Sequence, residues 1–299
     1  MTMGGANLST INVDDIYEIE IVKGGSAGVL FGDGATGGAV NIITKNPNFV
    51  RDQFNLKTSL KSFSSKSKSI SYTKKINKFV VQSFASEEDT QGYRENSKFE
   101  SDIFNFDISF LKDPTTRYFA KLNYSEQLTE IPGNITLTDF YTRPRYSRTP
   151  EDFGTEKVNA ISIGSQNILD SGNKFSNVFK FEDKDQTTSA LSGGRYILAK
   201  TNLETATLSS KLTKKQRFNN LDLKSKLGID FFNSSYRAIG NDWYQVKYHN
   251  IASQNIIEPF GIFEFNHSSN EKIDYEIGFR YHYYELDTDN YTTKTSLSS

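Results

Sequence analysis

Residues 16–45, IYEIEIVKGGSAGVLFGDGATGGAVNIITK, decide the fold of this chain. The stretch begins with an alternating run, Tyr17 to Lys23, that is typical of a strand. It ends with a second apolar run, Ala39 to Thr44, that is also typical of a strand. Between the two runs the glycines are dense, which indicates backbone with positive φ or in very close contact with other groups. The expected order is therefore strand, glycine-rich loop, strand.

The glycine-rich loop also matches G-x-G-x-x-G, the dinucleotide-binding pattern, from Gly32 to Gly37. That pattern binds pyrophosphate only where a helix follows the glycines, because the phosphates lie at the helix N-terminus. Here Gly38 is followed by Ala39 and Val40, the start of an apolar run rich in β-branched residues. Such a run predicts a strand, so the context argues against a nucleotide site.

The same stretch resembles the C-terminal end of the plug domain of TonB-dependent outer-membrane receptors, over about 30 residues. The resemblance rests on residue type and spacing at Ile19, Glu20, Ile21, Lys23, Gly24, Phe31, Gly32, Gly34, Ala35, Gly37, Gly38, Val40, Asn41, Ile42, Ile43, Thr44 and Lys45. Gly25 departs from the family pattern, which usually has proline there. The resemblance implies a membrane β-barrel after the plug. It also implies structural roles in the plug motif for Gly24, Gly32, Gly34, Gly37, Gly38 and Asn41.

Composition excludes several classes of protein. A net charge of −1 gives no overall basic field for nucleic acid, and the absence of cysteine excludes disulfides and Cys-based metal sites. The three histidines, His249, His267 and His282, have no metal-site spacing. No catalytic motif, P-loop or zinc signature is present, so we expect no enzyme activity, no metal and no cofactor. A polar chain with 13% aromatic residues suits a barrel whose strands are apolar on one side only.

From Gln53 onward the pattern alternates with period two. The alternation is clear in 54–61, 103–110, 117–124 (with Phe119 as an exception), 221–231 and 272–283, and weaker in 66–76, 78–87, 157–166, 173–182, 199–212 and 256–266. Each segment is near the length that a tilted transmembrane strand needs. The predicted fold class is all-β, with about 11 strands of a 22-stranded antiparallel transmembrane β-barrel preceded by the end of a plug. We place the plug in residues 1–46 and the barrel in residues 47–299.

The connectors alternate in length, as in outer-membrane barrels, where short turns face the periplasm and long loops face outside. Short connectors are expected at 75–78, 112–115, 169–173, 213–220 and 267–271, and long ones at 88–101, 127–156, 183–198, 234–255 and 286–299. The first outer connector, near 62–65, is an exception because it is short.

The long loops hold the candidate ligand-binding residues. Loop 127–156 has the densest cluster, in which planar guanidinium groups suit carboxylate or catecholate oxygens and aromatic rings suit flat ligands. The candidates are Tyr141, Arg143, Arg145, Tyr146 and Arg148 in that loop, Tyr93 and Arg94 in 88–101, Arg195 and Tyr196 in 183–198, and Trp243 and Tyr244 in 234–255. Two other interpretations stay open: a solvated loop, or arginines that face lipopolysaccharide phosphates. His249, also in a long loop, is a minor candidate for haem iron.

The resemblance implies a receptor in the outer membrane of a Gram-negative cell, in contact with outer-membrane lipid. Such receptors take up ferric siderophores, cobalamin or haem, driven by TonB through an N-terminal segment that is absent here; we expect a ferric chelate. Residues 1–9 lack a signal peptide's apolar core and 45 residues are too few for a whole plug, so we expect a fragment. One rival is a soluble or surface β-rich binding or adhesion module. A passive channel is another, although it needs no glycine-rich plug.

Overall fold

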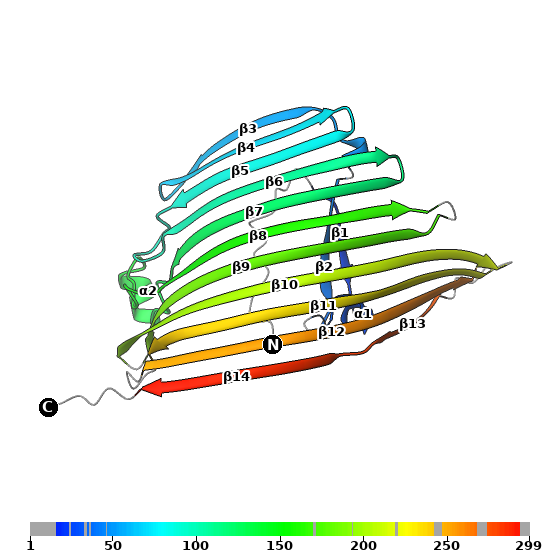
Figure 1. Ribbon diagram of the computed structural model, residues 1–299. Helices are drawn as coiled ribbons and strands as arrows, with labels where there is room; N and C mark the ends of the chain where they lie inside the picture. Colours follow the sequence, from blue (N-terminus) through cyan, green and yellow to red (C-terminus); the bar gives the residue numbers. More distant parts are fainter. Residues whose placement is uncertain are drawn as a thin grey trace.

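The computed structural model describes residues 16–293, except for residues 24, 33–34, 36, 46, 170–171, 193, 219–220, 242–246 and 268–273. Nearly all of the described chain is strand, arranged as a two-stranded sheet and a curved antiparallel sheet of 12 strands (Figure 1). This arrangement confirms the all-β fold class. No helix in the described part is long and apolar enough to cross a membrane.

The small sheet pairs β1 (Ile16–Val22) with β2 (Ala39–Thr44), as expected for the two apolar runs. Glu20 lies opposite Asn41, and the Asn41 side chain donates to the Glu20 carboxylate over 2.9 Å. Gly38, directly before β2, has a φ of +130°, and a Cβ there would lie 2.9 Å from the Val22 carbonyl oxygen. Glycine is therefore required at Gly38 for the hairpin to close.

The segment between β1 and β2 differs from the loop that we expected, because Gly25–Phe31 form a short helix, α1. Gly32, with a φ of +87°, follows the helix and donates to the Gly28 carbonyl oxygen, as glycines that end helices commonly do. The helix thus precedes the glycines and β2 follows them, which is the reverse of a dinucleotide-binding turn. Gly25 is the first helical residue, a position that favours proline, so the proline usual in the resembling family suits α1.

The large sheet follows a 3₁₀ turn at Pro47–Phe49. Its strands are β3 (Gln53–Lys61), β4 (Ser65–Ile76), β5 (Phe79–Thr90), β6 (Phe99–Asp113), β7 (Thr116–Glu130), β8 (Phe153–Ile168), β9 (Lys174–Ser192), β10 (Arg195–Phe218), β11 (Leu221–Asn241), β12 (Lys247–His267), β13 (Asp274–Arg280) and β14 (Tyr283–Thr293). Strands from β3 to β12 pair with their sequence neighbours, whereas β13 and β14 each pair with one half of β12. Because β13 and β14 share the place beside β12, the 12 strands fill 11 places in the sheet. We predicted about 11 strands.

Pro259 explains why the last place is divided between two strands. Proline has no N–H to donate to a ladder, and the pairing of β12 with β13 stops at Phe260. Pairing resumes at Ile257 with β14, and across the gap Tyr281 donates to the Pro259 carbonyl oxygen over 3.0 Å. The gap places His282 outside the ladder.

The two faces of the large sheet have opposite chemistry, which can be followed along rows of directly paired residues, because paired residues share a face. One row, on the face that contacts α1, is mostly small or polar: Val80, Ser109, Phe119, Gly164, Val178, Ser209, Asp230 and Glu258. The adjacent row, on the other face, is apolar throughout: Val81, Ile108, Ala120, Ile163, Phe179, Leu208, Phe231 and Ile257. The inner face is thus polar and the outer face apolar, as in membrane barrels.

Phe119, the exception to the alternation, faces inward and fits against a glycine on the next strand. Gly164 is its direct partner on β8, and a Cβ at Gly164 would lie 2.5 Å from the Phe119 ring. The Arg117 guanidinium lies 4.9 Å from the centre of the same ring. The aromatic side chain therefore replaces the side chain that Gly164 lacks and is held by a cation.

Several connectors differ from the prediction. The loops expected at 88–101 and 127–156 are present but shorter, at 91–98 and 131–152, and the early turn at 62–64 is short as expected. The prediction of a long loop at 183–198 is wrong, because β9 and β10 continue through these residues and meet in a tight hairpin. β11 and β12 likewise occupy most of 234–255, β10 most of 213–220, and β14 the first part of 286–299. Strands of up to 24 residues therefore extend past the 9–11 that span a bilayer.

Candidate ligand-binding loops and the inner wall

Two loops at one end of the large sheet form a single unit, which we call the loop platform: residues 91–98 and 131–152. The helix α2 (Leu137–Thr142) lies within the platform, at the end of the sheet opposite the turns at 77–78 and 114–115 (Figure 1). Strand polarity places the turn 62–64, the β9–β10 hairpin and the platform at this same end. Phe63 of the first turn also contacts Tyr93 edge-on, with ring centres 5.5 Å apart.

Arg94 joins the two halves of the platform. Its guanidinium donates four hydrogen bonds of 2.6–3.2 Å to backbone carbonyls across the platform, those of Pro132, Gly133 and Tyr146. Four charge-assisted bonds to backbone occupy most of the donors that an arginine has. Arg94, a candidate for ligand binding, therefore has a structural role that the sequence does not reveal.

Asn96 makes a second set of bonds between the loops. Its side-chain amide donates to the carbonyls of Ile131, Thr149 and Asp152 over 2.6–3.1 Å. The backbone N–H of Glu95 donates to the Arg145 carbonyl over 2.7 Å. Together with Arg94, these contacts make 91–98 and 131–152 one body.

The exposed surface of the platform carries guanidinium groups stacked on aromatic rings. Arg143 lies 3.8 Å from the centre of the Tyr146 ring, and Arg145 lies 5.4 Å from that of Tyr93, across the two loops. Tyr141 is 75% exposed, and Arg148 is also exposed. Six of the predicted residues, Tyr93 among them, are therefore gathered at one end of the molecule, with Arg143 and Arg145 oriented by rings.

Helix α2 is held by an ion pair that perturbs both of its partners. Arg143 donates to the Asp139 carboxylate over 2.6 Å, and Thr136 caps the helix by accepting from the Asp139 backbone N–H. The hydrogen bond from Arg143, and then that from Thr136, lowers the pKa of Asp139 below its ordinary value. The same bond raises the pKa of Arg143. The Arg143 guanidinium is therefore both charged and fixed in place.

The other candidates lie differently. Arg195 and Tyr196 begin β10 rather than lying in a long loop, and Tyr196 pairs with Leu191, whose N–H donates to Asp152 of the platform over 2.7 Å. Trp243 and Tyr244, and the motif residues Gly24 and Gly34, lie outside the described residues. His249 is a residue of β12 paired with Ile239, not a loop residue as expected. Among the described residues, no cluster of three or more His, Asp or Glu side chains could hold a metal ion.

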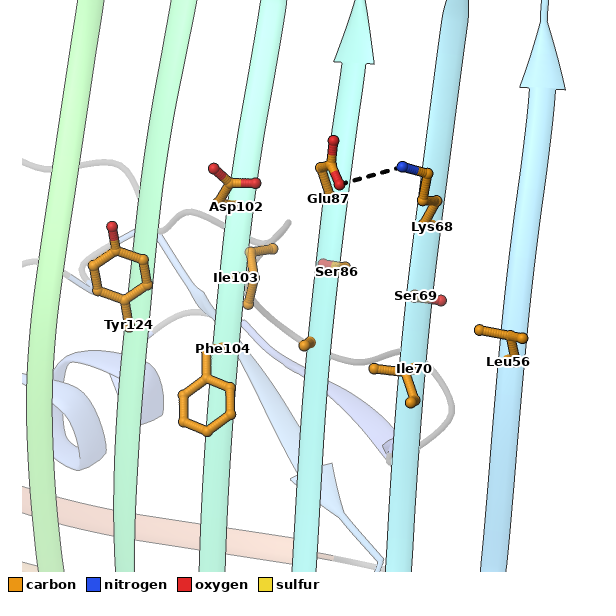
Figure 2. A pocket seen from close by; sticks show the side chains of 11 residues that line it. Leu56, Lys68, Ser69, Ile70, Ser86, Glu87, Asp102, Ile103, Phe104 and Tyr124 are labelled. Atoms are coloured by element: carbon orange, nitrogen blue, oxygen red, sulfur yellow. Dashed lines mark ion pairs between the residues drawn. The ribbon is translucent and has the colours of Figure 1, made fainter.

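A groove of about 430 Å³ crosses the outer face of β3 to β7 (Figure 2). Leu56, Ile70 and Phe104 line it, and at its rim the Lys68 ammonium lies 3.6 Å from the Glu87 carboxylate. The rim belongs to a charged row on the outer face: Lys68, Glu87, Asp102, Glu126, Lys157 and Asp185. The groove therefore marks the level at which the apolar outer face ends and charged side chains begin, on the side of the loop platform.

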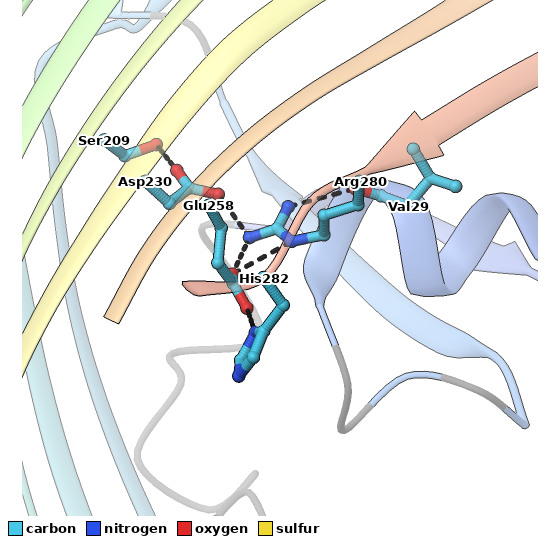
Figure 3. A network of polar contacts seen from close by, with 6 residues as sticks. All are labelled: Val29, Ser209, Asp230, Glu258, Arg280 and His282. Carbon is cyan, nitrogen blue, oxygen red and sulfur yellow. Dashed lines mark hydrogen bonds and ion pairs between the residues drawn. The ribbon is translucent and has the colours of Figure 1, made fainter. Parts of the chain in front are cut away.

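Sequence reasoning missed a buried cluster on the inner wall. Asp230, Glu258 and Arg280 are each less than a tenth exposed and pair with one another beside α1 (Figure 3). Their alternation with apolar neighbours indicates only that they face inward. The signal that the sequence does contain is Pro259, which breaks the ladder next to them.

Solved structures of outer-membrane receptors have this architecture. FpvA of Pseudomonas aeruginosa, bound to heterologous pyoverdines, matches with a TM-score of 0.76 and 12% identity over 94% of this chain and 43% of its own. The ferric yersiniabactin uptake receptor FyuA from Yersinia pestis gives 0.71 and 10% over 92% and 49%. The ferric-catecholate import receptor Fiu from E. coli K12 gives 0.68 and 12% over 92% and 57%.

No family model and no curated protein sequence matches the chain. The chain spans about half the length of the solved receptors that it matches. It aligns with them over more than nine-tenths of its own residues. The chain therefore has the fold of the TonB-dependent outer-membrane siderophore receptors.

Proposed function

We propose that this chain is part of a TonB-dependent outer-membrane receptor that takes up a ferric chelate. One observation carries the proposal. Helix α1 and the glycine motif contact the polar inner face of the large sheet, and the outer face of that sheet is apolar. Apolar side chains such as Ile163 and Leu208, 51% and 42% exposed, suit contact with lipid and disfavour a soluble or adhesive β module. A passive channel would have no use for the plug.

The proposed activity is transport without covalent chemistry, so the protein is not an enzyme. We place the plug in residues 1–46 and the barrel in residues 47–299. The plug fills the lumen, the membrane lipid contacts the outer face, and TonB acts through a segment outside the described residues. Ligand passage requires the plug to shift within the barrel.

The ligand, in this proposal, is an anionic ferric chelate that first contacts the loop platform. Arg145 and Arg148 present charged donors, and Tyr93 and Tyr141 present rings at the outer end of the sheet. Guanidinium groups bind carboxylate or catecholate oxygens in two-point geometry. The structurally similar receptors are named for ferric yersiniabactin, ferric catecholate and pyoverdine, which suit the same chemistry. Cobalamin and haem are the alternatives to be tested beside them.

The test is binding and uptake of radiolabelled ligands, with iron-55 in the chelates and haem and cobalt-57 in cobalamin, by iron-starved cells that express the complete gene. A panel of carboxylate and catecholate chelates, haem and cobalamin identifies the ligand class. We expect the double variant Arg145→Ala/Arg148→Ala to weaken binding of the preferred chelate by tenfold or more. The matched control is Arg217→Ala, because Arg217 is exposed at the opposite end of β10, paired with Asp222. Equal binding by both variants would contradict the role of the platform, and no binding across the panel would contradict the proposed function.

A further inference from the structure

A cluster of charged side chains on the inner wall contacts the end of α1 (Figure 3). Arg280, the last residue of β13, lies 2.8 Å from the Asp230 carboxylate and also bonds to Glu258. The second oxygen of Glu258 contacts His282, in the gap between β13 and β14. Ser209 donates to the other oxygen of Asp230 over 2.5 Å. All of these side chains belong to the wall, on β10 to β13 and the gap that follows.

The Arg280 guanidinium is fixed before it contacts the plug. Its charged end lies 5.0 Å from the centre of the Phe260 ring, and Phe260 is itself 3% exposed. Two carboxylates and a ring therefore determine its orientation. The guanidinium nitrogen that does not contact a carboxylate faces α1 (Figure 3).

Among the described residues, the plug contributes backbone and apolar atoms to this contact. Arg280 donates to the Val29 carbonyl over 3.0 Å, and Val29 is in the last turn of α1, where carbonyls lack intrahelical partners. Gly32 packs over the ion pair, where a Cβ would lie 3.4 Å from the Glu258 carboxylate. The Val29 methyls would lie 3.2–3.3 Å from a Cβ at Gly278 on β13. The end of α1 is thus seated on the wall without any charge of its own.

We propose that this cluster is a reversible docking site for α1, with Arg280 as the residue that binds and releases the helix. When α1 leaves, Arg280 loses one carbonyl but keeps both carboxylates, so no charge is left unpaired in the lumen. Separation of a buried ion pair across the contact would leave two unpaired charges and resist movement far more strongly. The site therefore holds the plug by a charge-assisted bond and still allows it to move. This inference rests on the proposed function, in which the plug must shift for the ligand to pass.

The test uses a disulfide that forms only when α1 is docked. The chain has no cysteine, so Val29→Cys/Gly278→Cys introduces the only pair, at positions close enough for a bond. The complete protein is oxidised in outer-membrane vesicles, and the rate of cross-linking is followed with Arg280 intact and in Arg280→Gln. The matched control is Arg117→Gln, which removes another inward arginine, bonded to Ser109 on β6 and not to the described plug residues.

We expect Arg280→Gln to slow cross-linking at least fivefold and Arg117→Gln to leave it unchanged. Equal rates in the Arg280→Gln protein and its parent overturn the proposal. If Arg280→Gln fails to insert, Arg280→Lys decides, because lysine keeps the charge but lacks the fork that reaches both carboxylates and the carbonyl. A rate for Arg280→Lys at least twofold slower than the parental rate supports docking by Arg280, and an unchanged rate overturns it. Cross-linking requires neither ligand nor TonB, so the outcome is independent of whether the ferric chelate proposal holds.

Discussion

At the scale of single residues, side chains of one type have different roles in this protein. The sequence groups Arg94 with Arg145 and Arg148 because all three are arginines in predicted outer loops. In the structure, Arg94 donates its bonds to backbone carbonyls, whereas Arg145 stacks on Tyr93 and Arg148 is exposed. Spacing along the chain does not distinguish these roles, because the carbonyls that Arg94 binds are about 40–50 residues away.

We predict that Arg94→Ala loosens the loop platform. The variant loses the four hydrogen bonds of Arg94 and leaves their carbonyl acceptors without those donors. We therefore expect the free energy needed to open the platform locally to fall by about 2 kcal/mol. That change corresponds to about 30-fold faster cleavage after residues such as Phe140 by chymotrypsin added to intact cells. Arg148→Ala is the control, because the Arg148 side chain is exposed. Equal cleavage of the two variants would contradict the structural role of Arg94.

We predict that helix α2 loosens in acid. The pKa of Asp139 is lowered in the folded loop, so the contribution of its ion pair to loop stability is fully present above the ordinary pKa of about 3.9. It disappears as the pH falls through the lowered pKa. A spin label on Tyr141→Cys should therefore keep constant mobility from pH 8 to 5 and become more mobile towards pH 2.5. In Asp139→Asn the label should be mobile throughout, and a change centred near pH 7 in the parent would contradict the assignment.

At the scale of elements, strand alternation is the feature that sequence predicts best. Direct pairing brings Ile163, Phe179, Leu208 and Phe231 into one apolar row on the outer face. A one-residue shift in register would turn their polar neighbours to this face, so the alternation itself specifies the register. Strand ends are predicted less well, because β9 to β12 continue beyond the apolar part of the outer face, with polar residues on both faces. The loop expected at 183–198 is a hairpin for this reason.

We predict that neighbouring residues of β10 respond oppositely to a charge. Leu208 is 42% exposed on the outer face, so Leu208→Arg is expected to cost about 2–4 kcal/mol near the bilayer midplane. Thr207 is the preceding residue and faces inward, so Thr207→Arg is expected to change stability by less than about 1 kcal/mol. Urea unfolding in lipid vesicles, read by the mobility shift of unheated samples on gels, measures both. Similar losses for the two variants would contradict the assignment of the faces.

At the scale of the whole molecule, the large sheet has two open edges in the described part of the chain. β3 lies at one edge, and β13 with β14 lies at the other. Unpaired backbone N–H and C=O groups are not tolerated in hydrocarbon, so a spanning sheet must close. The solved receptors that this chain matches are about twice its length, which suits a closed barrel.

We predict that these 299 residues, refolded alone in lipid vesicles, do not give a folded monomer whose gel mobility changes on heating. The open edges of β3 and β14 should instead pair between copies, giving oligomers or aggregates. The control is the complete gene product under the same conditions, which should insert as a monomer. A stable, inserted monomer of these residues alone would show that the sheet closes by itself.

The sequence by itself determined the fold class, the inward and outward faces of the strands, and the two strands that flank the glycine-rich stretch. These features depend on local periodicity and spacing, because alternation of residue type sets which side of a strand faces outward. The tertiary structure decided which arginines bind backbone carbonyls and which are exposed, the contact of α1 with Arg280, and the inward position of Phe119 over Gly164. Each of these depends on which distant segments meet. Such contacts arise from strand register and loop packing, which no local pattern encodes.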